Sequence, residues 1–433
     1  MVDEDQGASG RRLWWEMLIL GCMYAGYMGF ILCRTAIYAA SPAMVGDPAL
    51  GLSKAMFGAL LGWGTAGMVV GKLLSGAVAD RLGGRRVFLS ALAFTATTAL
   101  AFSLARSHAL LCLLNFTMLL AASAGWPAMS KLIAAWYEPD RYGKVWGVVS
   151  TSSRLSSVLS TLLLGALLAR VSWPRIFLVA GVSTAGVAAV ISVLLKAGPS
   201  DVGLPAPGAA SNEKQRPHPL DDSGLRQALL YFARSGRVWL ICLSIMCTTV
   251  MMEVIGFLPL YLRDTLALSP GRAASASSVF PAGCFAALLA GGWLYDRVSR
   301  KGRAWLLGAM LSIAALCLMT LLAMTRAALG AGTAFAATAV VLFFYGLTLA
   351  PAYYLPMSVF SVEFGGKHCG VLISLIDAMG YGAAMLYQFG GGAIVDAPGG
   401  WPRMLGLLLV TSVLATASTV WFALQDATLP QGR

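Results

Sequence analysis

Apolar runs long enough to cross a lipid bilayer follow one another along almost the whole chain. A membrane-spanning helix needs about 20 mostly apolar residues, whereas each strand of a membrane barrel shows about 10 residues of alternating polarity. The alternating pattern is absent, and only 12% of the 433 residues are charged. The sequence therefore predicts an all-α, integral, multi-pass membrane protein. Its twelve spans begin near residues 14, 55, 87, 110, 145, 176, 238, 273, 304, 330, 370 and 404.

The basic residues follow the predicted membrane topology. The formal net charge is +12, which in a soluble protein would suggest a polyanionic partner. With the N-terminus inside, the cytoplasmic segments hold 19 Lys and Arg residues and the outer segments hold 8. Cytoplasmic loops of membrane proteins carry an excess of this kind. We therefore expect both termini in the cytoplasm, a bacterial inner membrane as the location, and no nucleic-acid partner.

Two short segments resemble each other at half-chain spacing. Gly76-Ala-Val-Ala-Asp80-Arg81 follows the second span, and Gly292-Trp-Leu-Tyr-Asp296-Arg297 follows the eighth, 216 residues later. A duplicated six-helix unit produces such a repeat, and paired halves of this kind bind their substrate where they meet. Residues 197–236 are rich in Pro, Gly, Ser and charge, which predicts a linker. The expected organisation is two pseudo-symmetric six-helix bundles, 1–196 and 237–433.

Six ionisable residues fall inside the predicted spans. They are Arg34, Lys72, Lys131, Arg154, Glu253 and Asp377. Such residues are costly in a membrane and are candidates for function, although a structural ion pair or a snorkelling side chain explains some of them equally well. Tyr27, Arg34 and Tyr38 share one helix face, and polar stripes on apolar helices should line a water-filled cavity.

The bases outnumber the acids in this set by four to two, which favours an anionic ligand. Arginine offers a planar fork for carboxylate or phosphate, and lysine adds a point charge. The eight cysteines form no CxxC pair and have no histidine at metal-ligand spacing. The sequence also contains no phosphate-binding glycine loop and no pair of catalytic carboxylates. We expect no cofactor, no metal and no enzymatic activity, so a gradient must drive any transport.

Taken in order, these motifs resemble the organophosphate:phosphate antiporter family of the major facilitator superfamily. The residues concerned are Arg34 before Pro42, Gly71-Lys72, Gly125-Trp126-Pro127 with Lys131, and Gly198-Pro199-Ser200-Asp201-Val202-Gly203-Leu204-Pro205. The resemblance implies a phosphate-binding role for Arg34 and includes Lys72 and Lys131 in its motifs. Together with Arg154, Tyr27 and Tyr38, which the intramembrane charges and the tyrosine stripe single out, these are the expected substrate ligands. The resemblance also implies that the loops containing Asp80, Arg81, Asp296 and Arg297 act as conformational latches.

The second half departs from that family. Sugar- and glycerol-phosphate members have a second arginine in the seventh span, and the equivalent position here is Met251, with Glu253 nearby. Our first hypothesis is therefore an antiporter of a small organic anion, phosphorylated and exchanged for inorganic phosphate. The alternatives are a proton-coupled carrier of a carboxylate or zwitterion, with Glu253 or Asp377 titrating, and a transport-like membrane sensor. The expected partners are the substrate and the bilayer, with the protein itself a monomer.

Overall fold

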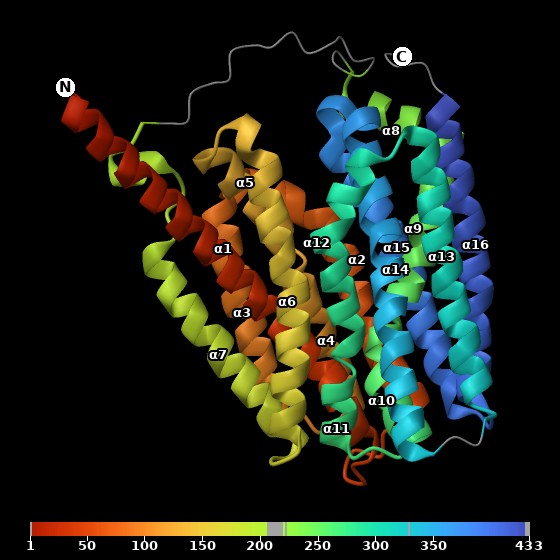
Figure 1. The fold of residues 1–433 in the computed structure, drawn as a ribbon. Helices are drawn as coiled ribbons and strands as arrows, with labels where there is room; N and C mark the ends of the chain where they lie inside the picture. Colours follow the sequence, from red (N-terminus) through yellow and green to blue (C-terminus); the bar gives the residue numbers. More distant parts are fainter. Residues whose placement is uncertain (1, 206–219, 221–222, 328–329, 429–433) are drawn as a thin grey trace.

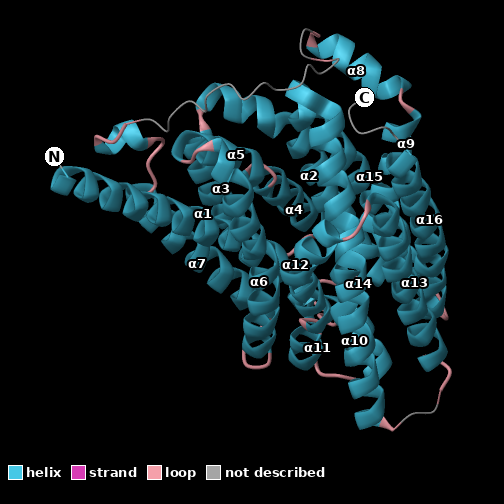
Figure 2. Ribbon diagram, turned by 45° about the horizontal axis from the view of Figure 1, so that its top comes forward, coloured by secondary structure: helices cyan, strands magenta, loops and turns pink. Residues whose placement is uncertain are grey.

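The protein is almost entirely helical. Its structure, a computed structural model, describes residues 2–205, 220, 223–327 and 330–428, and the side chains of all of these except 2–9, 139, 292–296, 362, 367 and 426–428. The described part of the chain contains no strand (Figure 2). Twelve stretches in it are long and apolar enough to cross a membrane, and each begins within four residues of the start expected from the sequence. The prediction of twelve spans is confirmed.

The helices divide into two groups on either side of the linker, and we call these groups the halves. The first half comprises α1 (Val2–Val45), α2 (Lys54–Leu82), α3 (Gly84–Leu104), α4 (His108–Ala122), α5 (Gly125–Trp136), η1 (Pro139–Arg141), α6 (Tyr142–Leu168), α7 (Trp173–Leu194) and η2 (Pro199–Val202). The second comprises α8 (Leu225–Arg234), α9 (Gly236–Met252), η3 (Glu253–Gly256), α10 (Leu258–Leu266), α11 (Pro270–Ala276), α12 (Val279–Arg297), α13 (Arg300–Met324), α14 (Ala331–Gly365), η4 (Gly366–His368), α15 (Cys369–Asp396) and α16 (Gly400–Thr428).

The halves meet along a few helix pairs. Helix α2 packs against α15, α6 packs against α11 and α12, and α1 packs against α10 and α11. Figure 1 shows α8 and the start of α1 at one end of the molecule, which we call the linker end, and α10 and α11 at the opposite, far end. The contacts of α1 with α10 and α11 therefore join the halves at the far end.

Prolines follow breaks in three of the twelve spans, because proline donates no backbone hydrogen bond and its ring pushes against the preceding turn. Pro127 follows the break between α4 and α5, Pro259 follows the break at η3, and Pro281 follows the break between α11 and α12. Pro42 lies inside α1, where it leaves the carbonyl of Tyr38 without its usual donor. The Ser41 hydroxyl donates to that carbonyl at 2.8 Å, so the missing backbone bond is replaced within the apolar interior.

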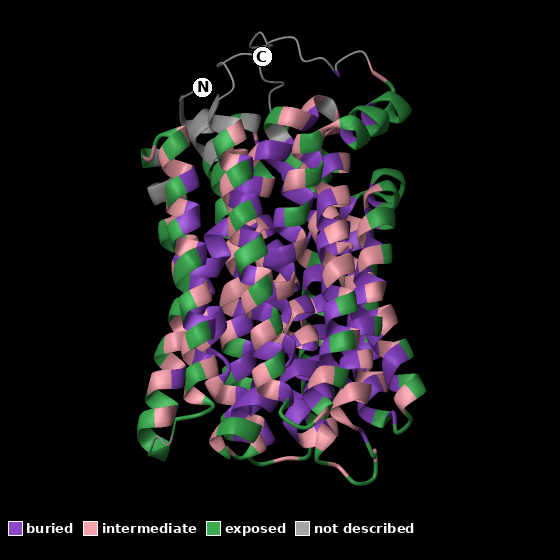
Figure 3. Cartoon of the chain, turned by 90° about the vertical axis from the view of Figure 1, so that its right-hand side faces the viewer, coloured by how far each residue is buried: buried purple, intermediate pink, exposed green. Residues whose placement is uncertain are grey.

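The outside of the bundle is apolar. Figure 3 shows exposed residues over the sides of the helices and buried residues between them. Exposed side chains along the spans include Leu163, Trp305 and Leu386, which are 65%, 70% and 67% accessible. Apolar side chains exposed in this number are typical of a surface that faces lipid. This agrees with an integral membrane protein.

The chain that follows α7 is held by hydrogen bonds to its backbone. Arg85 of α3 donates to the Leu195 carbonyl at 2.6 Å, just beyond the end of α7. The Asp201 carboxylate accepts the Ala197 backbone N–H at 2.9 Å, and Arg11 of α1 donates to the Val202 carbonyl at 2.8 Å. The start of the predicted linker is therefore attached to the first half. The linker boundaries at 197–236 stay a prediction, since 206–219 and 221–222 lie outside the described residues.

Two glycines allow a close approach between the halves. A Cβ atom added to Gly392 on α15 would lie 2.6 Å from the Cα of Gly58 on α2 and 2.8 Å from the Lys54 carbonyl oxygen. Small residues allow membrane helices to pack backbone against backbone in this way. The tight contact lies near the far end, because Lys54 begins α2.

We predict that Gly392→Ala destabilises the protein by on the order of 1–3 kcal/mol, because the added methyl group overpacks a backbone contact. The measurement is the thermal unfolding midpoint of the purified protein in detergent. Gly390→Ala on the same helix is the matched control, since a Cβ there meets no atom within 4 Å. Equal midpoints for the two variants would contradict the assigned contact.

Candidate functional site

Four of the predicted intramembrane charges form two ion pairs across the boundary between the halves. The Arg34 Nη2 atom of α1 lies 2.6 Å from the Glu253 Oε1 atom of η3. Lys72 of α2 pairs with Asp377 of α15. Each pair takes its base from the first half and its acid from the second. Because a charge in this environment needs a close partner, the two pairs tie the halves together at the centre of the molecule.

Arg34 is held by a second contact on its own helix. Its Nε atom donates to the Tyr38 hydroxyl at 2.6 Å, and its guanidinium lies 5.6 Å from the centre of the Tyr38 ring. The two residues are four positions apart, so they share one face of α1. The planar fork of Arg34 therefore binds a tyrosine on one side and the Glu253 carboxylate on another.

Gln388 extends this network back to the first half. Its amide nitrogen donates to the Glu253 Oε2 atom at 3.1 Å, and its amide oxygen accepts from the Thr65 hydroxyl at 2.6 Å. Gln388 and Thr65 are buried, at 1% and 2% exposure. The chain of contacts from Tyr38 through Arg34, Glu253 and Gln388 to Thr65 thus runs through α1, η3, α15 and α2.

The break in the seventh span places Glu253 at a helix terminus. Helix α9 ends at Met252, and Glu253 begins the short 3-10 helix η3. A stretch of 3-10 helix inside a longer helix often marks a hinge. Discontinuous helices are also how transporters place ion and substrate groups at the bilayer midplane. The local backbone can therefore adjust at the residue that binds Arg34.

Arg154 of α6 has a different environment from the other two central bases. Its guanidinium lies 5.0 Å from the centre of the Tyr354 ring on α14, so it also faces across the boundary between the halves. Its Nε atom is buried without a hydrogen-bond partner, as is the Tyr354 hydroxyl. Among the described residues, no carboxylate lies within ion-pair distance of Arg154.

A cavity opens beside the Arg34 and Lys72 pairs. Its empty volume is about 430 Å³, open solvent included. Lys72 lies 5.3 Å from the centre of the Tyr381 ring, which also lines the cavity. The Tyr27 ring packs edge-on against the Trp126 ring with centroids 5.5 Å apart. The lining residues are Tyr27, Phe30, Ile31, Arg34, Met68, Lys72, Ala122, Ser123, Trp126 and Tyr381.

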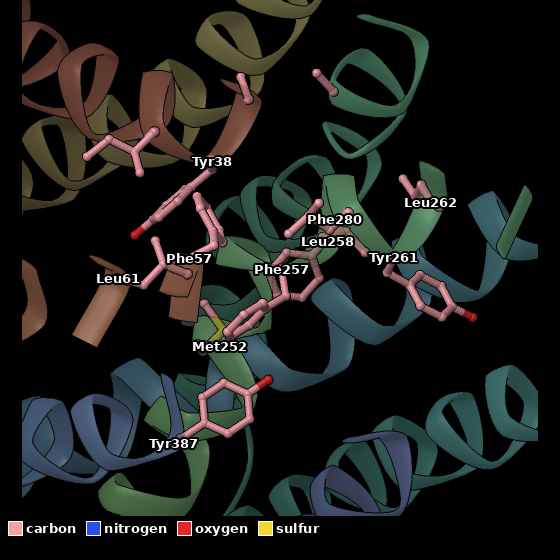
Figure 4. Close-up of a cluster of buried hydrophobic side chains, with 14 of the residues drawn as sticks. Tyr38, Phe57, Leu61, Met252, Phe257, Leu258, Tyr261, Leu262, Phe280 and Tyr387 are labelled. Atoms are coloured by element: carbon pink, nitrogen blue, oxygen red, sulfur yellow. The ribbon is translucent and has the colours of Figure 1, made fainter. Parts of the chain in front are cut away.

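Aromatic and aliphatic side chains close the region between this site and the far end. Figure 4 shows Tyr38, Phe57 and Leu61 from the first half facing Phe257 and Tyr387 from the second. The Phe57 and Phe257 rings meet edge-on with centroids 6.4 Å apart, and the Phe257 and Tyr387 rings do so at 6.0 Å. All five side chains are buried. This apolar layer separates the polar site from the far end.

An ion-pair cluster also ties the halves together at the far end. The Lys54 Nζ atom lies 2.5 Å from the Asp264 Oδ2 atom, and the Arg263 Nη2 atom lies 2.8 Å from Asp264 Oδ1. Arg263 also donates to the Pro42 carbonyl at 2.6 Å, and Trp401 donates to Asp264 at 3.1 Å. Burial raises the pKa of the Asp264 carboxyl, but hydrogen bonds from Lys54 and Arg263 outweigh burial and leave that pKa below its ordinary value.

The other predicted functional residues lie away from the cavity. Lys131 lies at the linker end, where its Nζ atom is 2.5 Å from the Asp80 Oδ1 atom, and both side chains are more than half exposed. The structure therefore does not bring Lys131 to Arg34 and Lys72, because the Asp80 carboxylate in the last turn of α2 holds it. Arg81 and Arg297 are exposed near the same end, and the side chain of Asp296 lies outside the described residues.

The structure adds residues to the site that the sequence did not single out as functional. Thr65 and Gln388 bridge the halves, and Tyr354 lies against Arg154. Neutral polar residues are common in membrane helices, so Thr65 gave no signal of its own. Tyr353 and Tyr354 lie between Pro351 and Pro356 within one span. These two prolines within a span were the sequence feature that could have drawn attention to Tyr354.

Comparison with known proteins points to membrane carriers. The model of the Major Facilitator Superfamily matches residues 23–386. The "Probable hexose phosphate transport protein" of Chlamydia pneumoniae is 24% identical over 322 residues, which are 70% of this chain and 69% of that protein. The "Membrane sensor protein UhpC" of Salmonella typhimurium is 27% identical over 334 residues, 74% of each chain. The "Gallate transporter" of Pseudomonas putida is 27% identical over 305 residues, 65% of this chain and 66% of that one.

Solved structures share the fold. A bacterial homolog of the human lysosomal transporter Spinster, in an inward-facing and unoccupied conformation, superimposes with a TM-score of 0.73 at 17% identity. The match covers 96% of this chain and 99% of that one. The D-xylose-proton symporter gives a TM-score of 0.69 at 14% identity and covers 94% and 97% of the two chains. The predicted twelve-helix fold with two six-helix bundles is confirmed.

We predict that Asp264→Asn lowers the stability of the protein by about 1–2 kcal/mol, less than for a fully buried pair because these side chains are partly exposed. The substitution leaves Lys54 and Arg263 without their acid. Because the pKa of Asp264 is lowered, its stabilising effect is complete above the ordinary carboxyl pKa near 4 and is lost only as the pH falls through the lowered value. Wild type and variant should therefore differ throughout about pH 6–8 in thermal unfolding midpoint. Asp140→Asn, an exposed carboxylate at the linker end, is the control and should match wild type.

Proposed function

Because the chain belongs to the major facilitator superfamily, as its residue pattern indicated, we propose that it is a secondary active transporter of a small organic anion. The observation that carries this proposal is the group of charges at the boundary between the halves. Arg34, Lys72 and Arg154 face Glu253 and Asp377 there. An excess of buried positive charge between two mobile halves suits a site that binds an anion and exposes it to each side in turn.

The proposed cycle is a rocking motion of the halves about this site. The Lys54–Asp264 pair and the Gly58–Gly392 contact join the halves near the far end. At the linker end, the Lys131–Asp80 pair and the Arg300–Glu363 pair each stay within one half. With the linker and both termini in the cytoplasm of a bacterial cell, this arrangement is an inward-facing state. The loops after α2 and α12 would latch the opposite state.

Two substrate chemistries deserve comparison. The names of the Chlamydia relatives support a phosphate ester. The name of the Pseudomonas relative supports a carboxylate. In either case the substrate would compete with Glu253 for the fork of Arg34. Binding would then weaken a contact between the halves and release them to move.

The proton-coupled alternative assigns the coupling proton to Glu253 or Asp377. Both carboxylates are in contact with a base, and an ion pair of this kind requires both groups to be charged. That geometry supports exchange over proton coupling. A sensor, the activity named for the Salmonella relative, would bind the anion without carrying it.

The test is uptake of radiolabelled anions into proteoliposomes that contain the purified protein. Liposomes loaded with inorganic phosphate and liposomes with an imposed pH gradient separate exchange from proton coupling. Uptake above that of empty liposomes, with either driving force, supports a transporter. Anion binding in detergent without any uptake would favour a sensor and reject the proposal.

We predict that Arg34→Lys loses most transport activity, by at least tenfold. Lysine keeps the charge, but one ammonium group cannot reproduce the fork that contacts Tyr38 and Glu253 together. The measurement is the initial uptake rate, normalised to the amount of folded protein. Arg106→Lys is the control, because Arg106 lies against the Trp173 ring outside the cavity. A variant of Arg34 with near wild-type uptake would remove this residue from the site.

The variant Glu253→Gln distinguishes an exchanger from a proton-coupled carrier. In an exchanger the variant weakens the Arg34 contact, so uphill uptake and equilibrium exchange should fall together. In a proton-coupled carrier the residue must titrate, so uphill uptake should vanish while exchange of labelled for unlabelled substrate continues. We expect the first pattern. Both activities are measured on one preparation, and loss of uphill uptake with intact exchange would overturn the antiport mechanism.

A further inference from the structure

The charges of the central site do not cancel. Two of its bases have an acid partner, since Arg34 pairs with Glu253 and Lys72 pairs with Asp377. Arg154 has no carboxylate partner among the described residues, and its Nε atom is buried without a hydrogen bond. With all five groups ionised, the site carries one net positive charge. Arg154 supplies that uncompensated charge.

This balance bears on the charge of the substrate. A single net charge in a membrane interior is best compensated by a single opposite charge, because any excess has no nearby water to solvate it. A phosphate monoester carries about −1.5 to −2 near neutral pH, so it would leave the closed site negative. A carboxylate monoanion would leave it neutral. The balance holds whichever base touches the anion, because Glu253 stays in the site when Arg34 releases it.

The side chains that line the site indicate the chemistry of the uncharged part of that anion. Each central base lies over a tyrosine ring, namely Tyr38, Tyr381 and Tyr354. Tyr27, Phe30, Trp126 and Tyr381 line the cavity together with Arg34 and Lys72. A planar aromatic ring packs well against such walls, because aromatic pairs gain from edge-on or offset contact.

The cavity offers few neutral polar groups for the several hydroxyls of a sugar. The Ser123 hydroxyl donates to the Leu120 carbonyl at 2.7 Å, and the other neutral polar groups of the lining side chains are the Tyr27 and Tyr381 hydroxyls and the Trp126 indole N–H. Buried hydroxyls without hydrogen bonds would weaken binding. We propose that the substrate of this transporter is an aromatic monocarboxylate whose charge is balanced by Arg154. This inference rests on the proposed function and narrows its substrate class.

The first test compares four anions by the thermal stabilisation that each gives to the purified full-length protein at pH 7.5. The probes are benzoate, cyclohexanecarboxylate, phenyl phosphate and glucose 6-phosphate. We expect benzoate to bind at least tenfold more tightly than either phosphate ester, and cyclohexanecarboxylate to lie between. Tighter binding of phenyl phosphate or glucose 6-phosphate than of benzoate would overturn the inference while leaving an anion transporter in place.

A second test uses pH to change the charge of one ligand without changing its shape. The second ionisation of a phosphate monoester lies near pH 6, so phenyl phosphate is mostly a dianion at pH 7.5 and mostly a monoanion at pH 5.5. A site that prefers monoanions should bind it about tenfold more tightly at the lower pH. Benzoate, measured at both values, corrects for any change that the pH makes in the protein itself, including the charged groups Arg34, Lys72, Arg154, Glu253 and Asp377. Binding of phenyl phosphate that weakens at pH 5.5 relative to benzoate would contradict the inference.

A third test asks whether Arg154 supplies the uncompensated positive charge, by measuring benzoate binding to variants of this residue. Arg154→Gln should weaken benzoate binding at least tenfold, whereas Arg106→Gln, which removes another arginine that lies over an aromatic ring, should not. Thermal unfolding of each variant without ligand shows whether it is folded, and Arg154→Lys, which keeps the charge, should recover part of the binding. Unchanged benzoate binding in folded Arg154→Gln would reject the assigned charge. If no anion stabilises the wild type or enters proteoliposomes, the proposed function fails together with this inference.

Discussion

The interior of a membrane offers almost no water to a charged group, and this constraint organises the centre of the protein. Arg34, Lys72, Glu253 and Asp377 can remain there because each finds an opposite charge from the other half. The same pairing makes the charges part of the contact between the halves. A transporter that must separate these halves therefore needs another way to satisfy its bases, and an anionic substrate provides one. Substrate binding and movement are linked through a single electrostatic requirement.

The backbone meets the same constraint at the places where its helices break. Pro42 and Pro259 interrupt the regular hydrogen bonding of their spans, and the polar groups set free must be satisfied inside the protein. Ser41 replaces the bond lost to Pro42, which keeps α1 continuous past Arg34 and Tyr38. Beyond Met252 the chain becomes 3-10 helix, and the Tyr345 hydroxyl donates at 3.1 Å to the Met251 carbonyl just before the break. One face of the site is thus rigid and the facing one can adjust, as a site between two moving bodies requires.

The sequence predicted the fold more completely than the site, for physical reasons. The apolar length of a span is a local property, so all twelve could be located without knowing how they pack. The charges of Arg34 and Glu253 were recognisable as costly residues within spans, but the identity of their partners depends on which helices meet. Lys131 shows what the sequence could not predict. Its position within the span gave no sign that it would pair with Asp80 at the linker end. Thr65 is a neutral residue, and only packing reveals that it anchors Gln388.

Closure at the far end differs in kind from the contacts at the centre. The layer formed by Phe57, Phe257 and Tyr387 is apolar and its contacts are insensitive to a charged ligand, whereas the Lys54–Asp264 pair beyond it is partly exposed and can exchange its partners for water. Opening the far end therefore requires little electrostatic work there, and the larger barrier lies in separating the buried pairs of the central site. A ligand acting at the centre can lower that barrier, while one acting at the far end cannot. We therefore propose that the charge balance around Arg154 decides which anions can drive the protein through its cycle.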